Sequence, residues 1–274
     1  MKYLTLLGLI LTFNCFAQAK KDTIKLRYSI FKPVPKELMR EFETDRPDIT
    51  ESAYSVDAGH FQVETDLFKT QQVKINGTKT TQNYFNLANI KLGITNSLDL
   101  QLVVTSLVHQ KTVSINTSTK KSEFGGFTFR VKQNIWGNDE GKTALAVMPF
   151  INIPALKSGT KFTGGIIFPF ALSLPNDWGF GAQFQTNLEE NQIQEGYHLN
   201  FLTSTTLSHS IFKNCNFFIE GYITQETEIN DLEYFANGGL IYEIGNNVKL
   251  DAGFNYGFKQ ESAKVYFIGL SFRY

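Results

Sequence analysis

Five charged residues fall within a short segment near the start of the chain: Glu43, Asp45, Arg46, Asp48 and Glu51. Arg46 is the one cation among them, and a guanidinium forms its strongest hydrogen bonds with carboxylates. Pro47 favours an extended backbone at this point. Two interpretations stay open. Arg46 could pair with a group of the main fold and tether the segment inside or beneath it, or the segment could simply be solvated.

No other pattern in the sequence predicts catalysis. The four histidines are His60, His109, His198 and His209, and none lies in a His-x-Ser-Asn-Gly arrangement. A nucleophile, a base and an orienting group could still converge in space, which spacing alone does not test. The chain also lacks paired His/Cys spacings for zinc and glycine patterns for phosphates or dinucleotides. We therefore predict no catalytic residue, no metal, no cofactor and no enzymatic activity.

The elements that must position these groups are strands. Between Val248 and Phe258 every even position is apolar or aromatic, while the odd positions are Lys, Asp, Gly, Asn and Gly. The same alternation runs from Trp178 to Leu188 and from Tyr266 to the terminal Tyr274. Strict alternation gives each strand one apolar and one polar face.

Nine further runs show the pattern less cleanly, which makes about twelve strands of the length that a tilted membrane strand requires. An even number lets a sheet close up-and-down. These runs are 61–69, 83–94, 98–108, 124–135, 144–153, 162–174, 196–209, 217–225 and 234–244. Tight turns at 96–97, 175–177 and 245–247 alternate with longer polar links near 70–82, 110–122, 154–161 and 189–195. In outer-membrane barrels the short turns are periplasmic and the long loops are external.

If the apolar faces contact lipid, the polar faces point into the lumen of such a barrel. This predicts charges of both signs inside it. The candidates for lumen-facing residues are Arg130, Lys132, Gln183, Gln185, Glu233, Glu243, Lys249 and Asp251. Barrels of about eight strands are filled by side chains and those of 16 to 18 hold an open channel, so about twelve strands imply a narrow path.

Composition and the chain start agree with this prediction. Aromatic residues make up 14% of the 274 residues, charged residues only 19%, and the formal net charge is zero, so we expect no nucleic-acid partner. Lys2, an apolar run from Leu4 to Phe13 and Cys15-Phe16-Ala17 fit an export signal. A lipoprotein with an acylated Cys15 is an alternative that Asn14 disfavours. After cleavage only Cys215 is left, so no internal disulfide can form.

We accordingly expect an all-β protein with three parts: a signal peptide at 1–17, a polar periplasmic or plug-like lead-in at 18–57, and at 58–274 a closed antiparallel up-and-down transmembrane β-barrel of about 12 strands. Its place would be the outer membrane of a Gram-negative bacterium. Polar and apolar residues also alternate along the strands of a soluble β-sandwich or a soluble barrel. Such proteins rarely carry so many aromatic residues on strands this long.

One segment also resembles a known family. The stretch from Phe42 to Ser52, FETDRPDITES, followed by VDAGHFQVE from Val56 to Glu64, resembles the start of a family of outer-membrane transporters assigned to the meta pathway of phenol degradation. The remaining chain is similar to that family in kind, as a barrel of similar length. The resemblance implies uptake of small aromatic compounds, and it supplies no catalytic residue.

We therefore expect an outer-membrane channel or transporter for small solutes, acting by passive passage through a narrow polar lumen. Its partners would be outer-membrane lipid, the barrel-insertion machinery during assembly and a small-molecule solute. Two alternatives stay open: a non-conducting structural or adhesion barrel, and a barrel enzyme of the phospholipase type. The sequence does not identify the solute, the oligomeric state or any gating.

Overall fold

The computed structural model describes residues 28–155 and 161–274. The predicted signal peptide, residues 1–17, and the first ten residues of the predicted lead-in lie outside the described residues. One short 3-10 turn, η1, precedes the strands, and no helix among the described residues is long and apolar enough to span a membrane. The elements are η1 Lys36–Leu38, β1 Phe61–Ile75, β2 Thr78–Gly93, β3 Leu98–Val113, β4 Ser118–Glu123, β5 Gly126–Trp136, β6 Thr143–Ile153, β7 Thr163–Ser173, β8 Trp178–Glu190, β9 Tyr197–Phe212, β10 Cys215–Glu226, β11 Asp231–Ile244, β12 Val248–Gly257 and β13 Lys264–Arg273.

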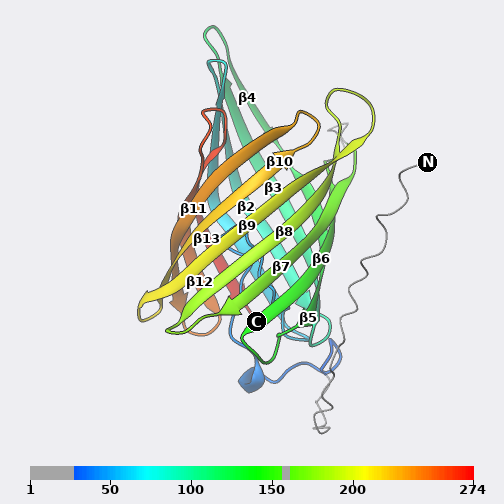
Figure 1. The fold of residues 1–274 in the computed structure, drawn as a ribbon, viewed down its shortest axis with the longest axis vertical. Coiled ribbons are helices and arrows are strands. Elements are labelled where there is room, and N and C mark those ends of the chain that lie inside the picture. Colours follow the sequence, from blue (N-terminus) through cyan, green and yellow to red (C-terminus); the bar gives the residue numbers. More distant parts are fainter. Residues whose placement is uncertain (1–27, 156–160) are drawn as a thin grey trace, which may run out of the picture.

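The strands form one closed antiparallel barrel (Figure 1). Apart from β4, each strand pairs with its neighbours along the chain, and closure comes from β13 pairing with β1 from Gln62↔Arg273 to Gln72↔Lys264. Of the 13 strands in the described part of the chain, β4 alone lies outside the ring, because it pairs only with the outer half of β3. The inner half of β3 pairs with β5. The ring therefore has 12 strands, and the fold predicted from alternation is confirmed.

Two links that we expected to be long loops are extended hairpins. β1 and β2 continue as a strand pair to a two-residue turn at Asn76 and Gly77, both with positive φ, as the type I′ turn requires. β3 and β4 likewise extend to the turn at 114–117. These hairpins stand beyond the barrel wall (Figure 1). The alternation disappears there because a strand pair in water on both faces has no apolar side to mark it.

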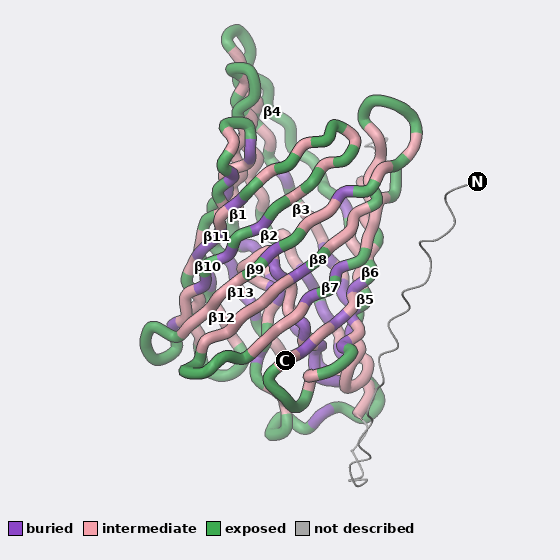
Figure 2. Tube along the Cα trace, viewed as in Figure 1, coloured by how far each residue is buried: buried purple, intermediate pink, exposed green. Residues whose placement is uncertain are grey.

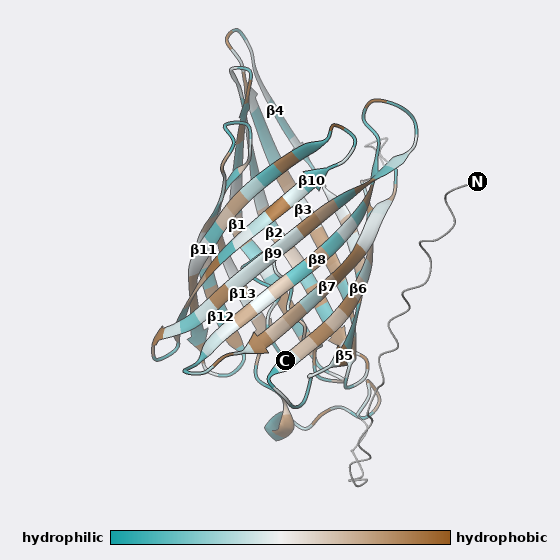
Figure 3. Ribbon diagram, in the orientation of Figure 1, coloured by the Kyte–Doolittle hydropathy of each residue, from teal (hydrophilic) through white to brown (hydrophobic). Residues whose placement is uncertain are grey.

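Residues at alternating positions of a strand differ in exposure, as expected when one face lines the inside of the barrel and the other its outer surface. On β13, Tyr266 and Ile268 are 54% and 52% exposed, while Val265 and Phe267 are 7% and 8% exposed. The pattern recurs around the wall, where buried or partly buried and exposed residues, and polar and apolar residues, alternate along the strands (Figures 2 and 3). An apolar outer surface of this extent is one that lipid covers.

The outer wall also carries an aromatic cluster near the end where the chain termini of the barrel lie. The rings of Trp178 and His209 stack with centroids 4.4 Å apart, and Phe217 packs edge-on against Trp178 at 5.9 Å. Aromatic girdles at the two membrane interfaces are typical of outer-membrane barrels. His209 is thus part of an interfacial ring cluster.

A new charge should cost more folding free energy on the outer face of a strand than at the neighbouring position on the inner face. Phe254 on β12 is 46% exposed on the outer face, and the next residue, Asn255, donates a hydrogen bond inside the barrel to Tyr222 Oη at 2.6 Å. We expect Phe254→Arg to cost about 2 to 4 kcal/mol of folding free energy in a bilayer. Asn255→Arg should cost less, because its side chain lies in the polar lumen. Unfolding titrations in lipid vesicles would measure both, and equal penalties would contradict the facing.

Candidate functional site

The described lead-in, residues 28–57, enters the lumen from the end that holds both termini of the barrel (Figure 1). Inside, its backbone is held by side chains of the wall. The amides of Ile49 and Thr50 donate to Glu220 of β10 at 2.9 and 2.8 Å, and the amide of Glu51 donates to Gln183 of β8 at 2.7 Å. Because this segment forms no strand, these wall groups satisfy backbone donors that would otherwise be buried unpaired.

Asp45 is held by two lysines from different strands. Its carboxylate lies 2.5 Å from Nζ of Lys132 on β5 and also pairs with Lys91 on β2. Lys91 pairs in turn with Glu64 of β1, which accepts hydrogen bonds from the amides of Asp45 and Arg46 at 3.0 and 2.9 Å. Both lysines and Glu64 are almost fully buried. Such charges can stay buried only when every one of them is paired.

Arg46 bridges the seam where the barrel closes. Its guanidinium lies 2.5 Å from Asp66 of β1 and 2.7 Å from Asp251 of β12, the neighbours of β13 on either side. Between them the guanidinium rests on Gly269 of β13, where any Cβ would collide with it. The glycine therefore makes room for the arginine. This arrangement corresponds to the first of the two interpretations of Arg46, in which it pairs with groups of the main fold and tethers the segment.

The remaining motif residues face other strands. Glu51 pairs with Arg130 of β5 at 2.7 Å, and Thr50 Oγ1 lies 2.7 Å from Ser204 Oγ of β9. Asp48 is half-buried, and the charged groups that act on it among the described residues are the carboxylates Glu220 and Glu51.

Enclosure changes how these carboxyls ionise. Burial opposes ionisation of Asp45, but the nearby Lys132 and Lys91 outweigh it and hold its pKa well below the usual value. Burial raises the pKa of Glu51 to about 7 despite Arg130. Enclosure and then the charge of Glu220 raise the pKa of Asp48 well above normal. The lead-in therefore carries less negative charge inside the barrel than its sequence suggests.

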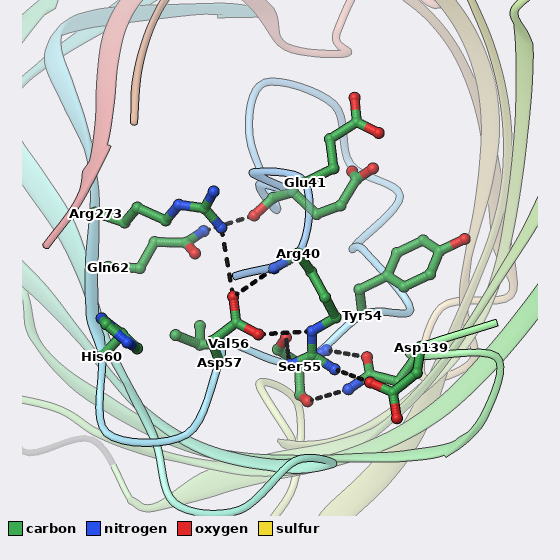
Figure 4. A pocket seen from close by; sticks show the side chains of 12 residues that line it. Arg40, Glu41, Tyr54, Ser55, Val56, Asp57, His60, Gln62, Asp139 and Arg273 are labelled. Carbon is green, nitrogen blue, oxygen red and sulfur yellow. Dashed lines mark hydrogen bonds and ion pairs between the residues drawn. The ribbon is translucent and has the colours of Figure 1, made fainter. Parts of the chain in front are cut away.

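At the mouth of the barrel a second set of ion pairs secures the lead-in. Figure 4 shows Asp57 between Arg40, 2.8 Å away, and Arg273 at the end of β13, 3.5 Å away. Arg40 also reaches Asp139 in the β5–β6 turn at 3.2 Å. These groups surround a cavity of about 290 Å³. Both ends of the lead-in's lumenal part are thus fixed to the wall.

A larger cavity of about 600 Å³ lies between the lead-in and the wall formed by β7 to β12. Small residues line it on β7 to β9, including Ser173, Gly179, Gly181 and Ser208. Phe218 of β10 adds an apolar surface to the same wall. The lead-in therefore crosses the lumen without filling it, because these strands present short side chains where the opposite wall presents charged ones.

The other predicted lumen residues do not contact the lead-in through hydrogen bonds or ion pairs in the described structure. Gln185 continues a ladder from Gln183 at 3.1 Å, Lys249 pairs with Glu243 at 3.2 Å, and Glu233 accepts a hydrogen bond from the Ser262 hydroxyl. Of the predicted set, Arg130, Lys132, Gln183 and Asp251 are the ones that bind the lead-in.

Sequence reasoning missed five charged wall residues that complete the network: Glu64, Asp66, Lys91, Asp99 and Glu220. Each is flanked on both sides by apolar or small uncharged neighbours along its strand. The sequence signal that could have identified these residues is a single charged residue between uncharged neighbours on the polar face of an alternating strand.

The fold is shared with solved outer-membrane barrels. The structure resembles an outer-membrane channel from Pseudomonas putida F1 with a TM-score of 0.56 and 13% identity, over 85% of this chain and 98% of that chain. It resembles the NanC porin with a TM-score of 0.50 and 11% identity, over 75% and 98%. At these identities the likeness concerns the fold.

Comparison by sequence gives two results. No curated protein matches the chain. The model of a family described as "Putative MetA-pathway of phenol degradation" matches residues 44–274, which takes in the charged segment from Asp45 onward and the whole barrel.

Proposed function

The chain belongs to this phenol-degradation family, and on that premise we propose that it is an outer-membrane channel through which small solutes pass passively beside the lead-in. The resemblance first suggested by the motif from Phe42 to Glu64 is confirmed by the family match. The observation that carries the proposal is the cavity of about 600 Å³ between the lead-in and β7 to β12. A solid plug would leave no such space.

The size and lining of this cavity indicate the solute class. A protein cavity of about 150 Å³ can hold benzene, so the space beside the lead-in accommodates a single-ring solute with its hydration water. Phe218 and Ile241 provide apolar contact. The charged groups of the lining have both signs, and its cations Arg46 and Lys249 are each paired with carboxylates. We infer that the preferred solutes are small aromatic compounds that carry a polar or zwitterionic group, since a lining with charges of both signs suits such groups.

In this proposal the parts of the chain have separate roles. Residues 1–17 direct export, the lead-in from 18 to 57 narrows the lumen, and the barrel from 58 to 274 spans the outer membrane with lipid around it. The barrel-insertion machinery would recognise the last strand, β13, together with the residue that follows it; Phe272 in this strand and Tyr274 just beyond it are both exposed.

A non-conducting barrel is the main competing function. Its support is the number of ion pairs that hold the lead-in across the lumen. The two functions differ in whether ions cross a membrane that contains the purified protein.

A barrel enzyme is a second alternative, and one contact motivates it. Nδ1 of His109 on β3 lies 2.6 Å from Oγ of Ser122 on β4. In the described part of the chain no carboxylate or amide orients this ring through a hydrogen bond, and the pair lies exposed on a hairpin. We therefore propose that the pair is a cross-strand contact and that the protein is not an enzyme.

Filling the cavity should block the channel. Ser208 lines it from β9, whereas the preceding Leu207 lies on the opposite face of the strand, paired across from Phe180. We expect Ser208→Trp to lower the single-channel conductance in planar bilayers clearly below that of the unaltered protein, because an indole group would occupy the path. Leu207→Trp is the matched control and should conduct normally. Equal conductance for both variants would place the path elsewhere.

A further inference from the structure

Three side chains with metal-binding chemistry converge at the mouth opposite the chain termini of the barrel. Glu189 lies at the end of β8, His198 pairs across from it on β9, and Glu226 is the last residue of β10. One ligand atom from each lies within 4.8 Å of the other two. Alternation directs all three to the lumen, since each stands an even number of positions from a buried inward residue of its own strand. Those residues are Gln183, Asn200 and Glu220.

The hydrogen bonds around His198 prepare one ring nitrogen as a ligand. Nδ1 lies 2.8 Å from Oδ1 of Asn191, an oxygen that can only accept, so Nδ1 carries the hydrogen. Nε2 then faces Oε1 of Glu226 at 2.6 Å. Nε2 is sealed from solvent, yet the contact lacks the geometry of a hydrogen bond. A histidine that binds a metal usually donates its second ring hydrogen in this way.

The charges at this point are unbalanced. The carboxylate of Glu189 has no hydrogen bond or ion pair in the described part of the chain. The carboxylate of Glu226 faces His198 and accepts hydrogen bonds from the side-chain amide of Asn200 at 2.7 Å and the backbone amide of Glu228 at 3.2 Å, both of which are uncharged donors. Two carboxylates therefore share one imidazole as their only cation, and that imidazole is charged only when doubly protonated. A divalent cation would neutralise both carboxylates and use the free Nε2.

We propose that Glu189, His198 and Glu226 form a binding site for a divalent transition-metal ion of the zinc type. One imidazole and two carboxylates suit Zn²⁺ better than Ca²⁺ or Mg²⁺, which prefer oxygen ligands throughout. Three protein ligands leave a fourth position for water or another small ligand. The proposal does not depend on whether the lumen conducts.

The bound ion would fasten the loop over this part of the mouth. Asn191 in the β8–β9 loop holds His198, and the next residues, Gln192 and Ile193, donate their amides to Glu228 at 2.9 and 2.8 Å. Glu228 in turn donates its amide to Glu226. A metal at the site would therefore tie β8, β9, β10 and their connecting segments together.

Zinc binding to the purified full-length protein in detergent tests the proposal. After treatment with EDTA, isothermal titration with ZnCl2 should show one ion per chain, and the affinity should fall as the pH is lowered because the proton on Nε2 competes. His198→Ala and Glu226→Gln should each weaken binding at least 10-fold. Asn191→Ala should weaken it about 10- to 100-fold.

Matched controls separate the site from nonspecific binding. His209→Ala removes a histidine from the outer wall, and Glu190→Gln removes a carboxylate that pairs with Lys161; both should bind zinc normally. Heat-modifiable mobility on a gel checks that each variant is folded. The proposal is overturned if the unaltered protein binds no zinc, if His198→Ala binds it equally well, or if CaCl2 binds as tightly as ZnCl2.

Discussion

Removal of residues 28–57, with the export segment before them retained, is expected to raise the single-channel conductance several-fold. The lead-in crosses the lumen of a 12-stranded ring, and its contacts with Glu220, Asp66 and Asp251 keep it there. Without it, the wall would enclose a water-filled path lined by charges of both signs. Planar bilayer recordings of the purified protein measure the change.

A shorter deletion is the control for this experiment. Residues 28–32 lie at the mouth, where Ser29 bridges to Thr95, and Phe31 is 95% exposed. Their removal should leave the conductance unchanged. If the longer deletion folds and inserts but conducts no better than the full chain, the lead-in is not the constriction.

The second large effect is expected for Arg46→Met. The substitution keeps much of the side chain's volume but leaves Asp66 and Asp251 as buried carboxylates without a cation, at 6% and 2% exposure of their side chains. Breaking a buried ion pair from one side costs about 3 to 5 kcal/mol. We expect a loss of this size in the free energy of unfolding, measured by urea titration in detergent or lipid.

Two further variants show whether unpaired charge is the cause. Adding Asp66→Asn and Asp251→Asn to Arg46→Met should recover most of the loss, because the stranded charges are gone. Lys121→Met breaks an ion pair with Glu123 on the exposed β3–β4 hairpin and should change stability little. A loss that persists in the triple variant would mean that Arg46 acts through packing on Gly269 alone.

The barrel was predictable from the sequence because successive side chains of a strand point to opposite faces. In a strand between lipid and lumen, polar and apolar residues therefore alternate. Runs such as Val248–Phe258 identify a strand without information from any other part of the chain. Prediction was wrong near 70–82 and 110–122, where strands continue past the membrane. There, paired residues such as Lys74 and Lys79 are exposed to water, so the strand pair leaves no alternation of polar and apolar residues in the sequence.

The place of the lead-in could not be read in the same way. Alternation says that Asp251 points inward, but it does not say that Arg46, 205 residues earlier, meets it. That contact depends on closure of β13 onto β1, which brings Asp66 and Asp251 to the two sides of Gly269. The family motif marked the segment as distinctive, while its partners became visible only with the closed ring.

Solute entry into liposomes that contain the purified full-length protein tests the central claim most directly. We expect swelling with single-ring polar and zwitterionic solutes, such as an aromatic amino acid, at rates well above those of protein-free liposomes. Ser208→Trp should slow this swelling, and Leu207→Trp should not. If liposomes with folded, inserted protein swell no faster than liposomes without it for every small solute, the barrel does not conduct and the proposed function is wrong.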